Sequence, residues 1–235
     1  MSTILYFDTE FTKRAVDGTL ISLGIISEDG KQFYAEFTDY NKEQVTETQK
    51  VWNIRKNIID KLFLTPQDEV FSTDDTKVLG DTTRITQELA TWLVQFDSVE
   101  FVCDTSSYSF VFLMQLFGGQ DNLPPNMCPA VTLLNTLIAR DLRISTWEAL
   151  DISRQDLSKI DMTTFNKDKG IAIFDARVLK QISENMGLFE ENVNESFIQE
   201  MKKCIKEDKE KKKKKPKKEE SVNEYNRVLA DLDFI

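Results

Sequence analysis

The hydrophobic and polar positions near the start of the chain predict three consecutive β-strands. Residues 4–7 form an uninterrupted apolar run, which is typical of a strand buried on both faces. Residues 20–27 are rich in β-branched side chains, residues 31–37 alternate polar and aromatic side chains, and a turn signal separates them at 28–30. We therefore expect an antiparallel meander that opens a mixed sheet.

Helical periodicity follows the meander. Apolar residues recur at helical spacing over 41–63 and over 83–96, and the polar segment 67–82 between them predicts a loop. A strand is expected over 98–104, followed by an apolar helix over 108–117. This alternation indicates an α/β fold, with a sheet flanked by helices.

The pattern is less regular in the second half of the chain. Residues 121–129 include three prolines and predict a surface loop, whereas 130–140 are apolar and fit either a strand or a helix. Short helical pieces are expected over 145–160, and longer helices over 174–186 and 193–206.

Charge divides the chain into segments that the hydrophobic pattern does not separate. Residues 207–220 are dominated by lysine, predict a disordered linker, and follow a C-terminal helix at 191–206. A short amphipathic segment, 221–235, lies beyond the linker. Of the net charge of −10, residues 1–201 carry −14, and we interpret 1–190 as the main domain.

Composition indicates a soluble globular protein. Hydrophobic residues make up 40% of the chain and charged residues 30%, and no apolar run approaches the roughly 18 residues that span a membrane. The three cysteines, Cys103, Cys128 and Cys204, lack paired spacing, which argues against a disulfide framework or a zinc site. With no signal-peptide pattern at the start, we expect a cytoplasmic protein.

The chain contains no histidine, which excludes several kinds of catalytic site. Serine–histidine and cysteine–histidine nucleophile systems are ruled out, as is imidazole as a metal ligand. Catalysis must therefore depend on carboxylates, bound cations, lysine or tyrosine.

Two carboxylates follow the first apolar run, at Asp8 and Glu10. Because side chains alternate along a strand, both acids point to the same side. Carboxylates at the edge of a core are costly unless a cation or a hydrogen-bond donor satisfies them, and Mg²⁺ or Mn²⁺ prefers such oxygen ligands. A solvated strand end is the alternative interpretation.

Two later acids stand at comparable places. Asp104 ends the strand at 98–104, and Asp175 lies at the start of a late helix. Taken singly, Asp104 is explained as a helix cap, and Asp175 as an acid that the helix dipole favours in the first turn. Together with the first pair they predict a site for two divalent cations at the sheet edge, which is the arrangement that supports phosphoryl displacement.

The residues around these acids resemble the DEDD family of 3′→5′ exonucleases, which has a ribonuclease H-like fold. The resemblance covers about residues 3–187 and is carried by three motifs, at 7–12, 102–110 and 172–177. It is greatest to the small bacterial and phage exoribonucleases. It implies that Asp8, Glu10, Asp104 and Asp175 are catalytic residues and ligands of two Mg²⁺ or Mn²⁺ ions.

The sequence departs from this family at the general base. The family has histidine five residues, or tyrosine four residues, before the last aspartate, and those positions here are Gly170 and Ile171. Neither side chain accepts a proton, and Lys167 or Lys169 would have to be neutral to replace it. Loss of a general base typically costs about 10²–10⁴-fold in rate.

Three functions remain open. The first is a slow, metal-dependent 3′→5′ exonuclease on single-stranded RNA or DNA, with Thr9, Phe11 and Phe110 in substrate binding. The second is a catalytically lapsed nuclease domain that binds nucleic acid ends or a protein partner, and the third is a purely structural domain. Phe11 and Phe110 are equally explained as core residues.

The C-terminal segments have two interpretations each. The lysine block at 207–220 is either a solubilising linker or a flexible, positively charged segment. In the second case its charge would offset the repulsion between the acidic domain and the phosphates of a nucleic acid. Residues 221–235 either fold back on the domain or dock into a hydrophobic pocket of a protein partner. The sequence also leaves open whether the chain forms a homodimer.

Overall fold

The computed structural model describes most of the main domain. Its described residues are 2–13, 15, 17–48, 54–62, 75–104, 107–142, 171–189 and 203. All of these except Lys203 belong to the unit Met1–Asn194. The predictions for 145–160, 193–206, 207–220 and 221–235 lie outside the described residues, apart from that one lysine.

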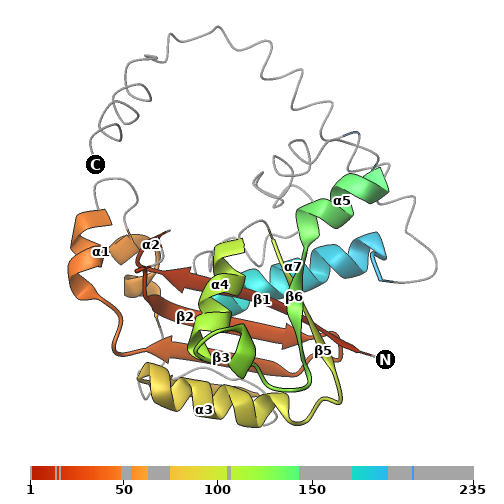
Figure 1. Ribbon diagram of the computed structural model, residues 1–235. Helices are drawn as coiled ribbons and strands as arrows, with labels where there is room; N and C mark the ends of the chain where they lie inside the picture. The colour runs from red at the N-terminus through yellow and green to blue at the C-terminus, as the bar shows by residue number, and fades with distance from the viewer. Residues whose placement is uncertain are drawn as a thin grey trace, which may run out of the picture. The chain divides into compact units, whose positions relative to one another are not determined.

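A six-stranded mixed sheet organises the domain, in the order β4-β3-β2-β1-β5-β6 (Figure 1). The first three strands pair antiparallel, whereas β5 runs parallel to β1, β6 parallel to β5, and β4 parallel to β3. The strands are β1 Thr3–Phe11, β2 Leu20–Ser27, β3 Gln32–Phe37, β4 Thr76–Gly80, β5 Val99–Cys103 and β6 Met127–Leu133. The predicted meander and the mixed sheet are confirmed.

Helices flank the sheet on both faces. Helices α3 and α4 pack on one face and α7 on the other (Figure 1). The helices are α1 Lys42–Thr48, α2 Ile54–Asn57, α3 Thr82–Leu93, α4 Ser107–Leu116, α5 Leu134–Leu142 and α7 Ala172–Met186, with short 3₁₀ helices at Ile59–Lys61 and Gln120–Asn122. None of the described helices is long and apolar enough to cross a membrane.

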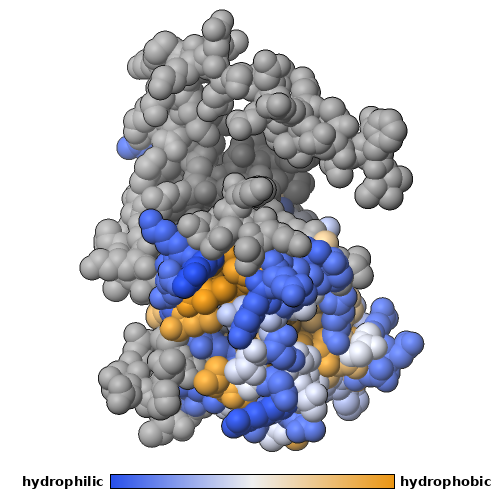
Figure 2. Space-filling view, turned by 90° about the vertical axis from the view of Figure 1, so that its left-hand side faces the viewer, coloured by the Kyte–Doolittle hydropathy of each residue, from blue (hydrophilic) through white to orange (hydrophobic). Residues whose placement is uncertain are grey.

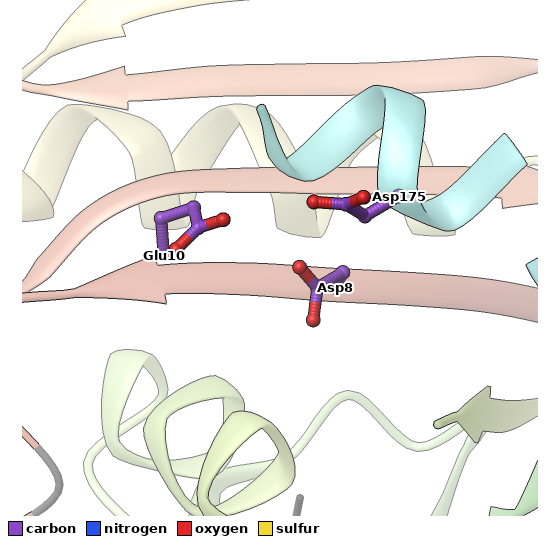
Figure 3. A group of neighbouring side chains, drawn as sticks. All are labelled: Asp8, Glu10 and Asp175. Carbon is purple, nitrogen blue, oxygen red and sulfur yellow. The ribbon is translucent and has the colours of Figure 1, made fainter. Parts of the chain in front are cut away.

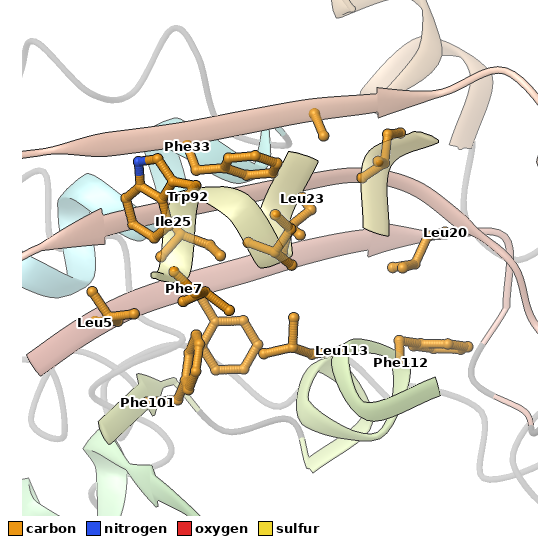
Figure 4. Close-up of a cluster of buried hydrophobic side chains, with 14 of the residues drawn as sticks. Leu5, Phe7, Leu20, Leu23, Ile25, Phe33, Trp92, Phe101, Phe112 and Leu113 are labelled. Carbon is orange, nitrogen blue, oxygen red and sulfur yellow. The ribbon is translucent and has the colours of Figure 1, made fainter. Parts of the chain in front are cut away.

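The main core lies between the sheet and helices α3 and α4 (Figure 4). Phe7 and Phe101 from neighbouring strands pack edge to face, with ring centroids 5.4 Å apart. Trp92 of α3 contacts Phe33 of β3 at 5.7 Å. Since burial of apolar area drives folding, this cluster holds β1 rigidly at the centre of the domain.

The structure corrects two sequence predictions and resolves one ambiguous segment. Residues 67–82, predicted as a loop, contain the edge strand β4, whose short segment has only two large apolar residues, Val78 and Leu79. The ambiguous segment 130–140 is divided between β6 and α5. The single helix predicted over 41–63 is replaced, within the described part, by α1, α2 and a 3₁₀ turn.

The predicted loop at 121–129 is corrected in part. Met127, Cys128 and Pro129 already belong to β6, which forms the outer edge of the sheet. Proline is tolerated at a sheet edge because it removes one ladder donor there without breaking a central strand. A proline-rich segment therefore does not exclude the start of an edge strand.

Hydrophobic side chains on the surface occur in patches among mainly hydrophilic ones on the face shown in Figure 2. The exposed large apolar residues of the described part are Leu79, Val94, Tyr108, Val111 and Phe189. Isolated exposure of this kind is usual in globular proteins.

Candidate metal centre

The face of β1 that carries the acids is covered by helix α7. Leu5, Phe7 and Phe11 of β1 face the main core, so the alternating positions Asp8 and Glu10 face the opposite side. On that side Asp8 pairs with Gly24 of β2, and Glu10 pairs with Ser22.

Gly24 allows α7 to approach the sheet closely. A Cβ atom at this position would overlap the backbone of Ala172 and Ile173 in the first turn of α7. Glycine inside a strand often marks such an approach of another backbone. The absence of a side chain at Gly24 therefore lets the helix start beside Asp8, and Asp175 lies in its first turn.

We predict that Gly24→Ala loosens this contact and weakens cation binding. The overlap is with backbone, which cannot rotate away, so the substitution should destabilise the domain by at least about 1–3 kcal/mol. Urea unfolding and Mn²⁺ titration measure the two effects. Gly80→Ala is the matched control, because its Cβ would meet mainly the flexible side chain of Arg84, at 2.8 Å from Cδ. Equal effects of both substitutions would contradict the role assigned to Gly24.

Three acids converge between β1 and α7 (Figure 3). One carboxylate oxygen from each of Asp8, Glu10 and Asp175 lies within 4.8 Å of the others. Glu10 is buried, with 7% of its surface exposed, and Asp8 and Asp175 are half-buried. The structure thus brings together three of the four acids predicted as ligands.

The fourth acid, Asp104, lies near this group. It directly follows β5, which runs parallel to β1 with Tyr6 opposite Val102, so the continued register places Asp104 beside Asp8, which lies within β1. Burial, followed by the charges of Glu10, Asp175 and Asp104, raises the pKa of Asp8 well above its ordinary value. The effect of Asp104 shows that it shares the electrostatic environment of the cluster, although it is outside the group of three.

The same negative field acts on Cys103. Burial, and then the carboxylates of Asp104 and Asp8, raise the pKa of this thiol to about 12. Because the thiolate is the nucleophilic form, Cys103 stays an unreactive thiol at neutral pH.

The donors of this cluster fit a hard divalent cation. All are carboxylate oxygens, which Mg²⁺ and Mn²⁺ prefer as ligands. Mutual repulsion among buried carboxylates costs free energy in the metal-free protein, and a bound cation would remove that cost. Asp8, Glu10 and Asp175, with Asp104 beside them, are therefore the residues that could hold one or two cations.

The residues predicted for substrate binding lie elsewhere. Phe11 and Phe110 are 8% and 6% exposed and belong to the main core, where Phe11 packs on Phe112 with centroids 4.9 Å apart. Thr9 is 3% exposed and alternates with Asp8, so its side chain faces away from the acids. Their role with substrate remains a prediction, which these positions do not favour.

Of the two positions that hold the general base in the family motif, the structure describes only Ile171. Ile171 is 5% exposed and packs with Tyr34, Ala172 and Ile173, so an apolar side chain occupies the tyrosine position of the family motif. Gly170, Lys167 and Lys169 lie outside the described residues.

Sequence reasoning missed three residues of the surrounding structure: Gly24, Tyr34 and Glu36. Gly24 had a signal, since glycine within a strand often marks a close backbone approach. Tyr34 and Glu36 are buried, at 0% and 4% exposed, and Tyr34 packs with Ile171, Ala172 and Ile173 at the start of α7.

Two known proteins are similar to this chain in sequence. No protein-family model matches the sequence. Two relatives from strains of Mycobacterium tuberculosis, each named a 3′-5′ exoribonuclease, are 28% identical to this chain over 128 residues. The match covers 52% of this chain and 66% of each relative, slightly less than two thirds of their length.

A solved structure has the same fold. The nuclease domain of 3′hExo, a DEDDh family member bound to rAMP, matches with a TM-score of 0.51 and 12% identity, over 82% of this chain and 96% of that one. The chain thus has the fold of this nuclease domain, and over about half of its length it is similar in sequence to two proteins named 3′-5′ exoribonucleases.

Proposed function

We propose that the protein is a divalent-metal-dependent 3′→5′ exonuclease that acts on single-stranded RNA or DNA. The observation that carries this proposal is the convergence of Asp8, Glu10 and Asp175 within 4.8 Å at a buried position between β1 and α7. RNA is the first substrate to test, because both relatives are named exoribonucleases.

In this proposal the four acids hold Mg²⁺ or Mn²⁺ and orient the terminal phosphodiester. Bound cations of this kind activate water and stabilise the charge that develops on the attacking and leaving oxygens. The charges of the other three acids all act to raise the pKa of Asp8. The close approach of α7 to β2 at Gly24, which pairs with Asp8, would set the spacing between Asp175 and the two acids of β1.

The two positions that hold the general base in the family motif carry no proton acceptor in this chain. Ile171 is buried and apolar, and Gly170 has no side chain that accepts a proton. We therefore expect hydrolysis that is slow for this family, by about 10²–10⁴-fold.

Incubation with end-labelled single-stranded oligonucleotides tests the proposal. We expect Mn²⁺-dependent shortening from the 3′ end, with a 5′-labelled RNA giving a ladder that EDTA abolishes. Asp121→Asn is the matched control because Asp121 is exposed in the 3₁₀ turn Gln120–Asn122, away from the acid cluster. No metal-dependent shortening of RNA or DNA at high protein concentration would overturn the proposal.

The second candidate is a catalytically lapsed domain that binds nucleic acid ends or a protein partner. The apolar side chain of Ile171 at the base position favours it. Retained binding of a 3′ end in Mn²⁺, without shortening, would select this function. A protein partner bound through 221–235, a homodimer and a cytoplasmic location are further proposals from the sequence.

A further inference from the structure

The stretch of β1 that carries Asp8 and Glu10 is paired on one side only. In the sheet β1 lies between β2 and β5, but β5 ends at Cys103 and pairs only with Thr3–Tyr6. Within the described residues, no strand continues along that side of β1 past Tyr6. The proposed cation site therefore lies at a local edge of the sheet.

Helix α4 packs against the same stretch of β1, beside this edge (Figure 3 and Figure 4). The Phe112 ring of α4 lies on Phe11, with centroids 4.9 Å apart. The Phe110 ring contacts Phe7, with centroids 6.4 Å apart. Because Phe7 and Phe11 stand on either side of the two acids along β1, these contacts hold α4 next to the proposed cation site.

The face of α4 that points away from the core is apolar. Tyr108 is 40% exposed and Val111 is 37% exposed. They are three residues apart and are therefore neighbours on one side of the helix. The helix, Ser107–Leu116, contains no charged residue. A surface helix normally presents polar or charged side chains to solvent, so a face of this kind, next to a site, indicates a contact with a ligand.

Tyr108 stands near the acids. It follows Asp104 by four residues, so their Cα atoms are at most about 14 Å apart. Asp104 lies beside Asp8 in the continued register of β5 and β1. Successive phosphates of a stacked strand are about 3.4 Å apart along its axis, so this distance corresponds to about four nucleotides.

A base of a single strand fits this surface better than a second protein chain. Aromatic side chains stack on bases of any sequence, and an uncharged helix does not repel the phosphates as the acidic domain around it does. The exposed parts of Tyr108 and Val111 are far smaller than the roughly 800 Å² that each partner contributes to a stable protein interface. Bases in a duplex are already stacked on their neighbours, so this surface favours an unpaired strand.

We propose that Tyr108 is a specificity-determining residue, whose ring stacks on an unpaired base within about four nucleotides of the 3′ end and so selects single-stranded nucleic acid. This inference rests on the proposed function, because it concerns the same substrate. It assigns to Tyr108 the stacking role that the sequence suggested for Phe11 and Phe110, whose rings lie in the core.

Fluorescence polarisation with a 5′-fluorescein-labelled oligouridylate tests the inference on the full chain. EDTA in the buffer prevents metal-dependent cleavage, so binding alone is measured. We expect Tyr108→Ala to weaken the Kd by about 5–30-fold, the lower part of the usual range for one base–aromatic stack, because the ring is only partly exposed. Tyr108→Phe keeps the ring and should stay within about twofold of wild type. The factor should be the same at low and high salt, since stacking releases no counterions.

Oligonucleotides with one abasic position at a time locate the stacked base. The wild-type protein should lose affinity when the base is removed at one or two adjacent positions near the 3′ end. Tyr108→Ala should be insensitive to the same changes. A purely structural role for Tyr108 predicts weaker binding of every oligonucleotide, with the position dependence retained.

Phe189→Ala is the matched control. Phe189 is 44% exposed and is the other exposed aromatic residue of the described part. It lies beyond the C-terminal end of α7, whereas Asp175 lies in the first turn, and the helix from Asp175 to Met186 is about 17 Å long. Phe189→Ala should keep the wild-type Kd, and a blunt duplex should bind equally to the wild type and to Tyr108→Ala.

The outcomes separate the inference from the proposed function. Metal-dependent shortening with an unchanged Kd in Tyr108→Ala overturns the inference alone. A Tyr108-dependent abasic position without any shortening supports the inference and overturns the proposed catalysis, in favour of the lapsed binding domain. Wild-type protein that neither binds nor shortens any oligonucleotide overturns both.

Two further measurements keep the test decisive. If binding requires the cation, the kinetics of shortening in Mn²⁺ decide: a KM raised by about 5–30-fold in Tyr108→Ala supports the inference, and an unchanged KM overturns it. Sedimentation of the wild type and Tyr108→Ala examines the alternative occupant. A change of oligomeric state with an unchanged Kd would assign the surface to a second copy of the chain and overturn the inference. If Tyr108→Ala does not fold, Tyr108→Leu, which is apolar but lacks a ring, takes its place.

Discussion

Asp8→Asn should abolish metal-dependent shortening of oligonucleotides. Asp8 belongs to the group of three converging acids, and the charges of Glu10, Asp175 and Asp104 all raise its pKa, so the substitution removes one of the proposed cation ligands. We expect the rate to fall by on the order of 10³-fold, because loss of a single preorganised donor to a transition state already costs about 10²–10³-fold. Gel assays with end-labelled RNA measure the rate, and calorimetry measures the accompanying loss of Mn²⁺ affinity.

The same substitution should stabilise the metal-free protein. The raised pKa of Asp8 means that folding disfavours its charged form, so stability is lost as the pH rises from the unfolded pKa through the folded one. Asparagine removes that charge and its repulsion by the other acids. We expect the melting temperature in EDTA at pH 7 to rise, with about 2–4 °C for each kcal/mol gained.

Asp121→Asn is again the control, since this exposed acid belongs to no cluster of the described residues. It should change neither rate nor melting temperature. A less stable Asp8→Asn protein, or one with undiminished activity, would contradict the electrostatic account of the site. Opposite effects on stability and activity are expected where a site stores unfavourable charge for function.

Gly170→His should raise the rate of hydrolysis by about 10²–10⁴-fold. This position lies five residues before Asp175, where the family that the sequence resembles has a histidine, and imidazole near its ordinary pKa accepts a proton at neutral pH. Initial rates of 3′ shortening in Mn²⁺ measure the gain, with Gly170→Ala as the control for the added side chain.

The pH dependence identifies the cause of any gain. If imidazole acts as the base, the advantage of Gly170→His over Gly170→Ala should decline below about pH 6.5, as the ring becomes protonated. Unchanged rates in a variant that still binds Mn²⁺ would mean that more than the base has been lost. The lapsed binding domain would then be the better account.

The central part of the fold was predictable because its signals are local. Continuous apolar residues at 4–7, the turn at 28–30 and the helical pattern before Met186 each occur within one element. The alternation of Asp8 and Glu10 also follows from strand geometry alone. These features place the first two predicted ligands on one face of β1 before any tertiary contact is known.

What the sequence did not reveal depends on contacts between distant segments. The strand β4 has little hydrophobic character of its own and is defined by its parallel pairing with β3. Tyr34 is buried because residues at the start of α7, about 140 residues later in the chain, pack on it. Tertiary burial of this kind overrides an alternating pattern, which by itself indicates a half-exposed strand.

The candidate site shows the same division. The acids were identified from the sequence as following an apolar run, ending a strand or starting a helix, although β1 continues past Asp8 and Glu10 to Phe11, and their convergence requires the close approach of α7 at Gly24. Phe11 and Phe110 illustrate the converse: aromatic residues next to motif residues lie in the core because alternation and helix phase turn them inward.

Crystals of the full chain grown with Mn²⁺ test the central claim most directly, through anomalous scattering at the manganese edge. The account predicts one or two peaks bounded by Asp8, Glu10 and Asp175, with Asp104 beside them, and loss of these peaks in Asp8→Asn. Manganese bound only at other surface acids, or no peak at a concentration that saturates binding in solution, would contradict it.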